Sequence, residues 1–332
     1  MQQGFWNVGI RKRMKATLRA SAAVAAVALA FTAAPLTGYA VRIEPVAQEG
    51  VTSNIFGSAG NQSEFYRQIS QTITQGQESL TITLDQPVSD QEEFIELCRQ
   101  AVYQARRDYP ESFLSNHTEF VYYYNESGYY QVTFSFRYLD LTDEQKQAMF
   151  ATVDGIVAQA RAQTGGDTVG MLRYFQQALC ERAEYDFAAA RSDSDHYPNS
   201  YHAYGALMEG KSVCQGYAYA FKLLCDKAQI PCWIVTGTYG DEPHAWNYVW
   251  VNNNYYLVDV TWDDANNRPA DSAFFLAGRD HAANYHVEDN CAPGTLAARS
   301  YSETGTTVIR RARQQTNQEE SSSRTLAGAA KG

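Results

Sequence analysis

The segment of residues 244–264, HAWNYVWVNNNYYLVDVTWDD, constrains the fold most strongly because it has the pattern of a hairpin. Apolar and aromatic side chains dominate both of its arms, and asparagines separate the arms. Asn252 and Asn253 suit a two-residue type I′ turn because asparagine tolerates positive φ. Such a turn places Val251 opposite Asn254 and predicts two adjacent antiparallel strands.

This register predicts which polar side chains meet on the hairpin. Counting outward from the turn puts Trp246 opposite Asp259, and His244 lies diagonal to Asp259 on the same face. Diagonal neighbours are about 7–8 Å apart, within reach of a hydrogen bond between imidazole and carboxylate. Asp259 stands between Val258 and Val260, where an unpaired carboxylate would be costly to bury. A one-residue slip would move the pair to opposite faces, so the pairing depends on the turn.

A cysteine in the segment of residues 210–232, GKSVCQGYAYAFKLLCDKAQIPC, is placed to act as a nucleophile. Gly210 fits the C-cap of a short helix, and Ser212 fits the N-cap of the next. We expect this second helix to run to about Lys227. Cys214 then lies in its first turn, where unpaired N–H groups and the helix dipole favour a thiolate. The same N–H groups can bind the oxyanion of a tetrahedral intermediate.

The other cysteines fit packing better than chemistry. Cys225 lies on the apolar stripe of the helix and Cys232 opens a strand, so we expect both to be buried. Cys180 falls on the apolar face of a helix predicted over about 168–183. The cysteine spacing lacks the paired pattern of a zinc site, and we expect no metal and no cofactor. A disulfide such as Cys98 with Cys180 stays an open alternative.

The first 40 residues have the pattern of an export signal. Five basic residues precede an alanine-rich apolar run at about 22–34, and small residues lead to Ala40. We expect cleavage near Val41, and Met14 is an alternative start. The apolar run is shorter than the roughly 20 residues that span a bilayer. The pattern therefore predicts a secreted or cell-envelope protein with no stable membrane span after cleavage.

The charge balance narrows the class of partner. The formal net charge is −10, and it becomes −15 without residues 1–40, which hold five basic and no acidic residues. Such a surface repels nucleic acid and anionic membranes. We therefore expect neither as a partner.

Three linked motifs, GKSVCQGYA, HAWNYV and YYLVDVTWDD, resemble the transglutaminase-like superfamily in their order and spacing. The core of that superfamily is similar to the core of papain-like cysteine proteases. The resemblance covers roughly residues 165–285, about a third of the chain, and includes NSYHAYGAL upstream and FFLAGRD downstream. It implies an α+β fold in which the cysteine-bearing helix packs on an antiparallel sheet. Calcium activation is not implied, because residues 61–140 do not resemble the β-sandwich that precedes the core in animal transglutaminases.

The resemblance also implies roles for individual residues. Cys214 would be the nucleophile, His244 the general base and acid, and Asp259 the group that orients the imidazole. All three positions carry the expected residue types. Gln215 and the backbone N–H of Cys214 would border the oxyanion site, and Trp246 would form a wall of the substrate cleft.

The implied chemistry is acyl transfer through a thioester, with a protein or peptide as substrate. Water as the second nucleophile gives hydrolysis and a lysine amine gives a crosslink, and the motifs are the same for both. We expect an exported cysteine hydrolase acting on peptide or glutamine-type amide bonds. The alternatives are a protein-glutamine γ-glutamyltransferase and a non-catalytic peptide-binding or scaffold module, against which the three intact residues argue.

The rest of the chain predicts the domain organisation. Capping boxes at Ser89–Glu92 and Thr142–Gln145 are expected to start helices, and alternation over 118–140 predicts a second hairpin. His117 is expected to serve packing or the surface, and residues 61–140 show no chemistry of their own. The expected division is a signal peptide at 1–40, a linker at 41–60, a small α+β domain at 61–140, a transglutaminase-like catalytic domain at 141–300 and a disordered tail at 301–332.

Overall fold

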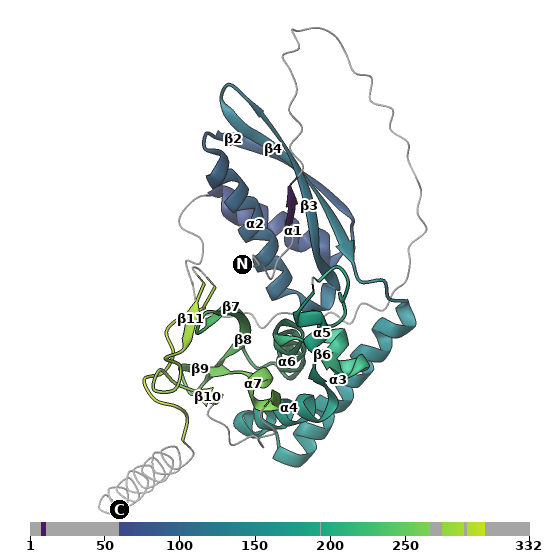
Figure 1. The fold of residues 1–332 in the computed structure, drawn as a ribbon, viewed down its shortest axis with the longest axis vertical. Coiled ribbons are helices and arrows are strands. Elements are labelled where there is room, and N and C mark those ends of the chain that lie inside the picture. The colour runs from purple at the N-terminus through teal and green to yellow at the C-terminus, as the bar shows by residue number, and fades with distance from the viewer. Residues whose placement is uncertain (1–7, 11–59, 193, 266–273, 289–290, 303–332) are drawn as a thin grey trace, which may run out of the picture.

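The structure is a computed structural model that describes residues 8–10, 60–192, 194–265, 274–288 and 291–302 (Figure 1). Within these ranges, two large clusters of buried apolar side chains form separate cores. One lies in an N-terminal layer and the other surrounds the cysteine-bearing helix. The predicted signal peptide, linker and tail lie outside the described residues, except for residues 8–10, 60, 301 and 302. The predicted domain boundaries stay a prediction.

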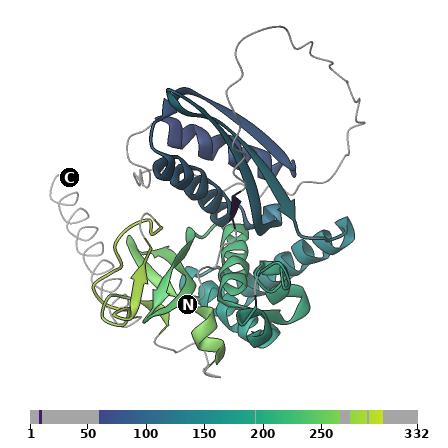
Figure 2. The ribbon, with the colours of Figure 1, turned by 45° about the horizontal axis from the view of Figure 1, so that its top comes forward.

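The N-terminal layer is a four-stranded sheet with two helices packed on one face (Figures 1 and 2). The strand order is β1-β3-β4-β2, with β1 parallel to β3 and the other pairs antiparallel. The predicted hairpin over 118–140 is confirmed as β3 and β4. The elements are β1 (Val8–Ile10), α1 (Gly60–Thr74), β2 (Ser79–Val88), α2 (Gln91–Asp108), a 3-10 turn (Pro110–Ser112), β3 (Leu114–Asn125) and β4 (Gly128–Tyr138).

The larger core is built around α6 (Cys214–Ala228), which is buried along almost its whole length. Helices α3 (Asp143–Thr164) and α4 (Thr168–Arg182) pack against α6, and strand β8 of an antiparallel sheet packs against it as well (Figure 1). The predicted α+β fold, with the cysteine-bearing helix on an antiparallel sheet, is therefore confirmed. The sheet order is β10-β9-β8-β7-β11, with β7 (Cys232–Tyr239), β8 (Glu242–Val251), β9 (Asn254–Val258), β10 (Phe275–Ala277) and β11 (Tyr285–Val287).

Short elements complete this core between α4 and α6 and after β9. Two two-residue strands pair in parallel and bring the chain before α5 against the chain before α6. A single π-helical turn lies between these two strands in the chain, and a short helix follows the hairpin. The elements are β5 (Glu184–Tyr185), α5 (Phe187–Ala190), the π-helical turn (Gly205–Glu209), β6 (Lys211–Ser212) and α7 (Val260–Ala265).

The register predicted for the hairpin is confirmed. Val251 pairs with Asn254, and the ladder continues to the pair of Asn247 and Val258. Asn252 and Asn253 have φ values of 49° and 63°, the left-handed conformation that a type I′ turn requires. The ladder ends at this pair, and Trp246 and Asp259 are the next residues on the two chains.

Two of the predicted helix caps are wrong. Ser212 lies in β6, where its hydroxyl donates to the carbonyl of Ser200, and Val213 takes the N-cap position of α6 without a side-chain cap. The cap of α2 is Asp90, whose carboxylate accepts from the amide of Glu93, so Ser89 does not cap it. The capping box of Thr142 and Gln145 at α3 is confirmed.

All six cysteines lie within the described residues and are free thiols. Cys98 belongs to the N-terminal core and Cys180 packs on the larger one, so the disulfide between them is not formed. The expected burial of Cys225 and Cys232 is confirmed. In the described ranges, the helices lack the combination of length and apolar content that a membrane span needs.

Candidate active site

Cys214 is the first residue of α6, and it lies at the junction of the helix with its sheet. The amides of the first helical turn have no partner within the helix, so they point past its N-terminus toward the thiol. The side chain is nearly inaccessible, with the residue 2% exposed. The helix start therefore offers a sheltered thiol beside free N–H donors, the setting that favours a thiolate.

His244 and Asp259 are joined as the hairpin register predicts. Nε2 of His244 lies 2.6 Å from Oδ2 of Asp259. The same oxygen accepts a hydrogen bond from the Tyr285 hydroxyl at 2.8 Å, and Oδ1 accepts from the Trp262 amide at 3.3 Å. Asp259 is 1% exposed, and these donors replace the water that the buried carboxylate has lost.

The electrostatics of His244 favour the imidazolium form. Burial by itself lowers the pKa of His244, but the charge and hydrogen bond of Asp259 raise it, and so does the Cys214 side chain. The net effect raises the pKa of His244 to about 10. Because Nε2 is held by Asp259, the ring nitrogen that remains for the thiol is Nδ1. The imidazole thus lies between the carboxylate and the Cys214 side chain, and its raised pKa favours the protonated form.

Aromatic rings hold the imidazole in this orientation. Trp246 stacks on His244 with ring centroids 5.9 Å apart and an interplanar angle of 21°. Tyr239, Trp262 and Tyr285 also contact the ring of His244. Trp246 is only 1% exposed, whereas Tyr239 and Trp262 are partly exposed. The role of Trp246 as a wall of a substrate cleft stays a prediction, and its direct contact is with the imidazole.

Gln215 lies beside Cys214, but its side chain points into the protein. It is fully buried, and its amide exchanges two hydrogen bonds with the amide of Asn116 on β3. The side-chain amide is therefore occupied, and the backbone N–H is the group of Gln215 that an oxyanion can reach. The prediction that Gln215 borders an oxyanion site therefore concerns its backbone N–H, and it stays a prediction.

Sequence reasoning missed several residues of the site. Tyr285 binds Asp259 from β11, and nothing in the sequence links positions 26 residues apart across a loop. Tyr185 flanks the thiol: burial raises the pKa of its hydroxyl, and the Cys214 side chain raises it further. The Tyr185 ring contacts that of Phe187, which is 62% exposed. No local sequence pattern indicated a role for Asn116, because its partner, Gln215, lies 99 residues away in the chain.

Metal-ligating residues do not gather at this site. Over the part of the chain that the structure describes, no three His, Cys, Asp or Glu side chains are arranged to hold a metal ion. The described groups that contact the His244 ring are aromatic rings and the Asp259 carboxylate. This arrangement can transfer protons to and from a sulfur nucleophile.

Comparison with known proteins agrees with this geometry. Residues 154–260 match the family model described as the transglutaminase-like superfamily. This segment is a transglutaminase-like core. The recognition made from the three motifs is thereby confirmed, and the matched range contains Cys214, His244 and Asp259.

Two curated relatives contain a related segment. Kyphoscoliosis peptidase of Homo sapiens is 31% identical over 96 residues, which are 25% of this chain and 14% of that protein. Its counterpart in Mus musculus is 30% identical over 96 residues, with the same shares. The chain thus covers 14% of the length of these relatives, and the similarity spans 96 residues.

One solved structure, described as a TGase, is similar over 55% of this chain and 50% of that chain. It is 15% identical, with a TM-score of 0.31. A similarity at this level is too low to show a shared fold. The fold of the transglutaminase-like core is seen in its own strands and helices.

Proposed function

We propose that the transglutaminase-like core is a cysteine hydrolase that acts on peptide or glutamine-type amide bonds of a protein or peptide substrate. The observation that carries this proposal is the position of His244, bonded to Asp259 through Nε2 at 2.6 Å and near enough to Cys214 for that side chain to raise the pKa of the imidazole. A nucleophile, its base and a group that orients the base are the parts that covalent acyl transfer requires.

In the proposed reaction, Sγ of Cys214 attacks the carbonyl carbon as a thiolate. The oxyanion that forms is bound by backbone N–H groups of the first turn of α6. The intermediate collapses to a thioester as the amine leaves with the proton of His244. Water then gives a proton to His244 and attacks the thioester, and the acid and the free thiolate are released. Asp259 keeps the imidazole in the tautomer and orientation that both proton transfers need.

Hydrolysis is preferred over amine transfer because the two mammalian relatives of the core carry the name peptidase. The same thioester would give a crosslink if a lysine amine replaced water. Mass spectrometry of a glutamine peptide incubated with the protein and a primary amine separates the two reactions. Deamidated or cleaved peptide supports hydrolysis, and an amine adduct would establish the transferase instead.

The labelling of Cys214 by iodoacetamide tests the proposal before any substrate is known. We expect wild-type Cys214 to react rapidly at pH 6, and His244→Ala to react about a hundredfold more slowly, because only the thiolate is a nucleophile. Cys214→Ala identifies the labelled residue by mass spectrometry. His286→Ala, an exposed histidine on β11, is the matched control and should leave the rate unchanged. Slow labelling of the wild type, like that of an ordinary thiol, would favour the non-catalytic binding module.

Export is part of the proposal and rests on the signal pattern of residues 1–40. N-terminal sequencing of protein recovered from outside the cytoplasm should start near Val41. Recovery of a chain that still begins at Met1 or Met14 would remove export from the proposal.

A further inference from the structure

The N-terminal layer contacts both of the elements that bring the thiol and the imidazole together. Asn116 on β3 reaches α6, whose first residue is Cys214. Arg107 on α2 reaches β7, the strand that pairs with the one carrying His244. A single layer therefore holds the helix and the sheet between which the reactive pair forms.

The contact with α6 is a reciprocal pair of amides. Nδ2 of Asn116 donates to Oε1 of Gln215 at 3.1 Å, and Nε2 of Gln215 donates to Oδ1 of Asn116 at 2.8 Å. Both side chains are buried, so loss of either leaves a donor and an acceptor without a partner, at about 1–3 kcal/mol for each group. Because Gln215 follows Cys214 directly, this pair resists rotation of the first turn of α6.

The contact with the sheet lies beside His244. Nη1 of Arg107 donates to Oγ1 of Thr236 and to Sγ of Cys291, both at 3.2 Å. Thr236 pairs across the sheet with Ala245, the residue after His244. Arg107 is itself buried, so a charged donor is fixed against this strand without competition from water.

We propose that Asn116 is a positioning residue for the nucleophile: through Gln215 it sets where Sγ of Cys214 lies relative to Nδ1 of His244. This inference rests on the proposed cysteine chemistry and gives residues 61–140 a part in it. The transfer of a proton between Sγ of Cys214 and Nδ1 of His244 depends on the distance between the two atoms. A displacement of about 1 Å can cost a hundredfold in rate. Because Arg107 anchors the sheet to the same layer, turning of α6 changes this separation directly.

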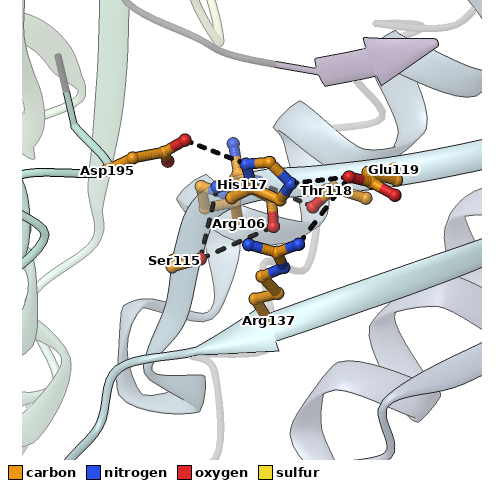
Figure 3. A network of polar contacts seen from close by, with 7 residues as sticks. All are labelled: Arg106, Ser115, His117, Thr118, Glu119, Arg137 and Asp195. Atoms are coloured by element: carbon orange, nitrogen blue, oxygen red, sulfur yellow. Dashed lines mark hydrogen bonds and ion pairs between the residues drawn. The ribbon is translucent and has the colours of Figure 1, made fainter.

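A second contact between the same parts of the chain supplies a matched control. His117, the residue after Asn116, lies between Asp195 and Glu119 (Figure 3). Its Nδ1 is 3.1 Å from Oδ2 of Asp195, and its Nε2 is 3.1 Å from Oε1 of Glu119. Asp195 belongs to the loop before the π-helical turn, so this contact bypasses both α6 and β7. Loss of His117 therefore weakens the junction without releasing Gln215.

The test measures the rate of Cys214 alkylation from pH 5 to pH 9 in the full chain. For Asn116→Ala we expect about a tenfold or greater loss at pH 6 but less than about a twofold loss at pH 9, where ordinary thiols ionise without help. His117→Ala should stay within about twofold of wild type at both values. A purely structural role would lower both rates together or neither.

Two double variants keep the test decisive if Asn116→Ala folds poorly. Asn116→Gln with Gln215→Asn restores an amide pair of the same total length, and should recover at least about half of the wild-type rate at pH 6. Asn116→Leu with Gln215→Met removes both partners in similar shapes, which is nearly neutral for stability. It should keep the thermal midpoint and still lose the reactivity at pH 6.

The outcomes separate this inference from the proposed function. A wild-type rate at pH 6 like that of an ordinary thiol overturns the proposed function, whatever Asn116 does. Rapid labelling of the wild type together with an unchanged rate in Asn116→Ala, or in the Leu and Met double variant, overturns the positioning role alone.

Discussion

At the scale of single residues, the site depends on a balance between burial and charge at His244. Burial opposes the imidazolium. The charge and short hydrogen bond of Asp259, together with the Cys214 side chain, more than offset this effect. Tyr285 and Trp262 in turn donate hydrogen bonds to the buried carboxylate of Asp259. The protonation of the imidazole beside the thiol therefore depends on Asp259.

Replacing Asp259 by Asn tests this balance. Without the carboxylate, burial is the larger remaining influence, and the pKa of His244 should fall from about 10 to below its usual 6.5. The imidazole is then neutral at pH 7, so Cys214 loses its counter-charge, and its alkylation at pH 6–7 should fall about tenfold or more. The rate should rise again only above about pH 8, where ordinary thiols ionise.

The control for this variant is Asp280→Asn, an exposed carboxylate outside the site that bonds Ser300. It should leave the pH–rate profile as in wild type. A profile of Asp259→Asn that coincides with that of wild type would mean that the carboxylate does not set the charge of His244.

At the scale of elements, the position of Cys214 depends on how closely the start of α6 approaches the chain before it. A β-carbon on Gly216 would lie 2.3 Å from Oγ of Ser212 and 2.5 Å from the carbonyl oxygen of Ser200. Glycine thus lets the first turn of the helix lie directly on this segment. The absence of a side chain at this position is a packing requirement, because the residue is part of the helix and needs no unusual φ.

Gly216→Ala should destabilise the fold and disturb the nucleophile together. Overpacking of a buried site costs about 1–3 kcal/mol of unfolding free energy, and the turn must shift to accept the methyl group. We expect that loss in denaturant unfolding, with slower alkylation of Cys214. Gly155→Ala on α3 is the matched control: nothing lies within 4 Å of its added β-carbon, so it should gain about 0.5–1 kcal/mol from helix propensity. Equal effects of the two variants would contradict the packing argument.

At the scale of the whole molecule, local patterns predicted the elements, while contacts between distant segments escaped them. The turn at Asn252 and Asn253 fixes the register by period two, so the meeting of His244 with Asp259 followed from counting. Nothing local indicates that Asn116 binds a glutamine 99 residues away, or that Ser212 enters a strand before it can cap a helix. Such pairings depend on how the two cores pack against each other. Hydrophobic periodicity indicates only which face of a helix or strand is buried within its own core.

One histidine joins these two cores and should make their docking sensitive to acid. Nε2 of His202 donates to the carbonyl of Pro110, and burial lowers the pKa of His202 to about 4. Between pH 6.5 and 4 the unfolded chain binds a proton at His202 that the folded chain does not. The unfolding free energy therefore falls as the pH is lowered, by up to about 1.4 kcal/mol per pH unit. The nearby Glu111 has the opposite effect on the unfolding free energy, because burial raises its pKa to about 7. Glu111 is unchanged in every variant compared below.

The measurement is the slope of unfolding free energy against pH, from urea titrations at pH 4 to 7. His202→Phe is less stable throughout, since the Pro110 carbonyl loses its donor. Between pH 4 and 6.5 the slope of its unfolding free energy against pH should lie below that of wild type by up to about 1.4 kcal/mol per pH unit. His286→Ala, which removes an exposed histidine, should keep the wild-type slope. If His202→Phe and wild type run parallel over this range, the buried imidazole is not what couples the docking of the two cores to protons.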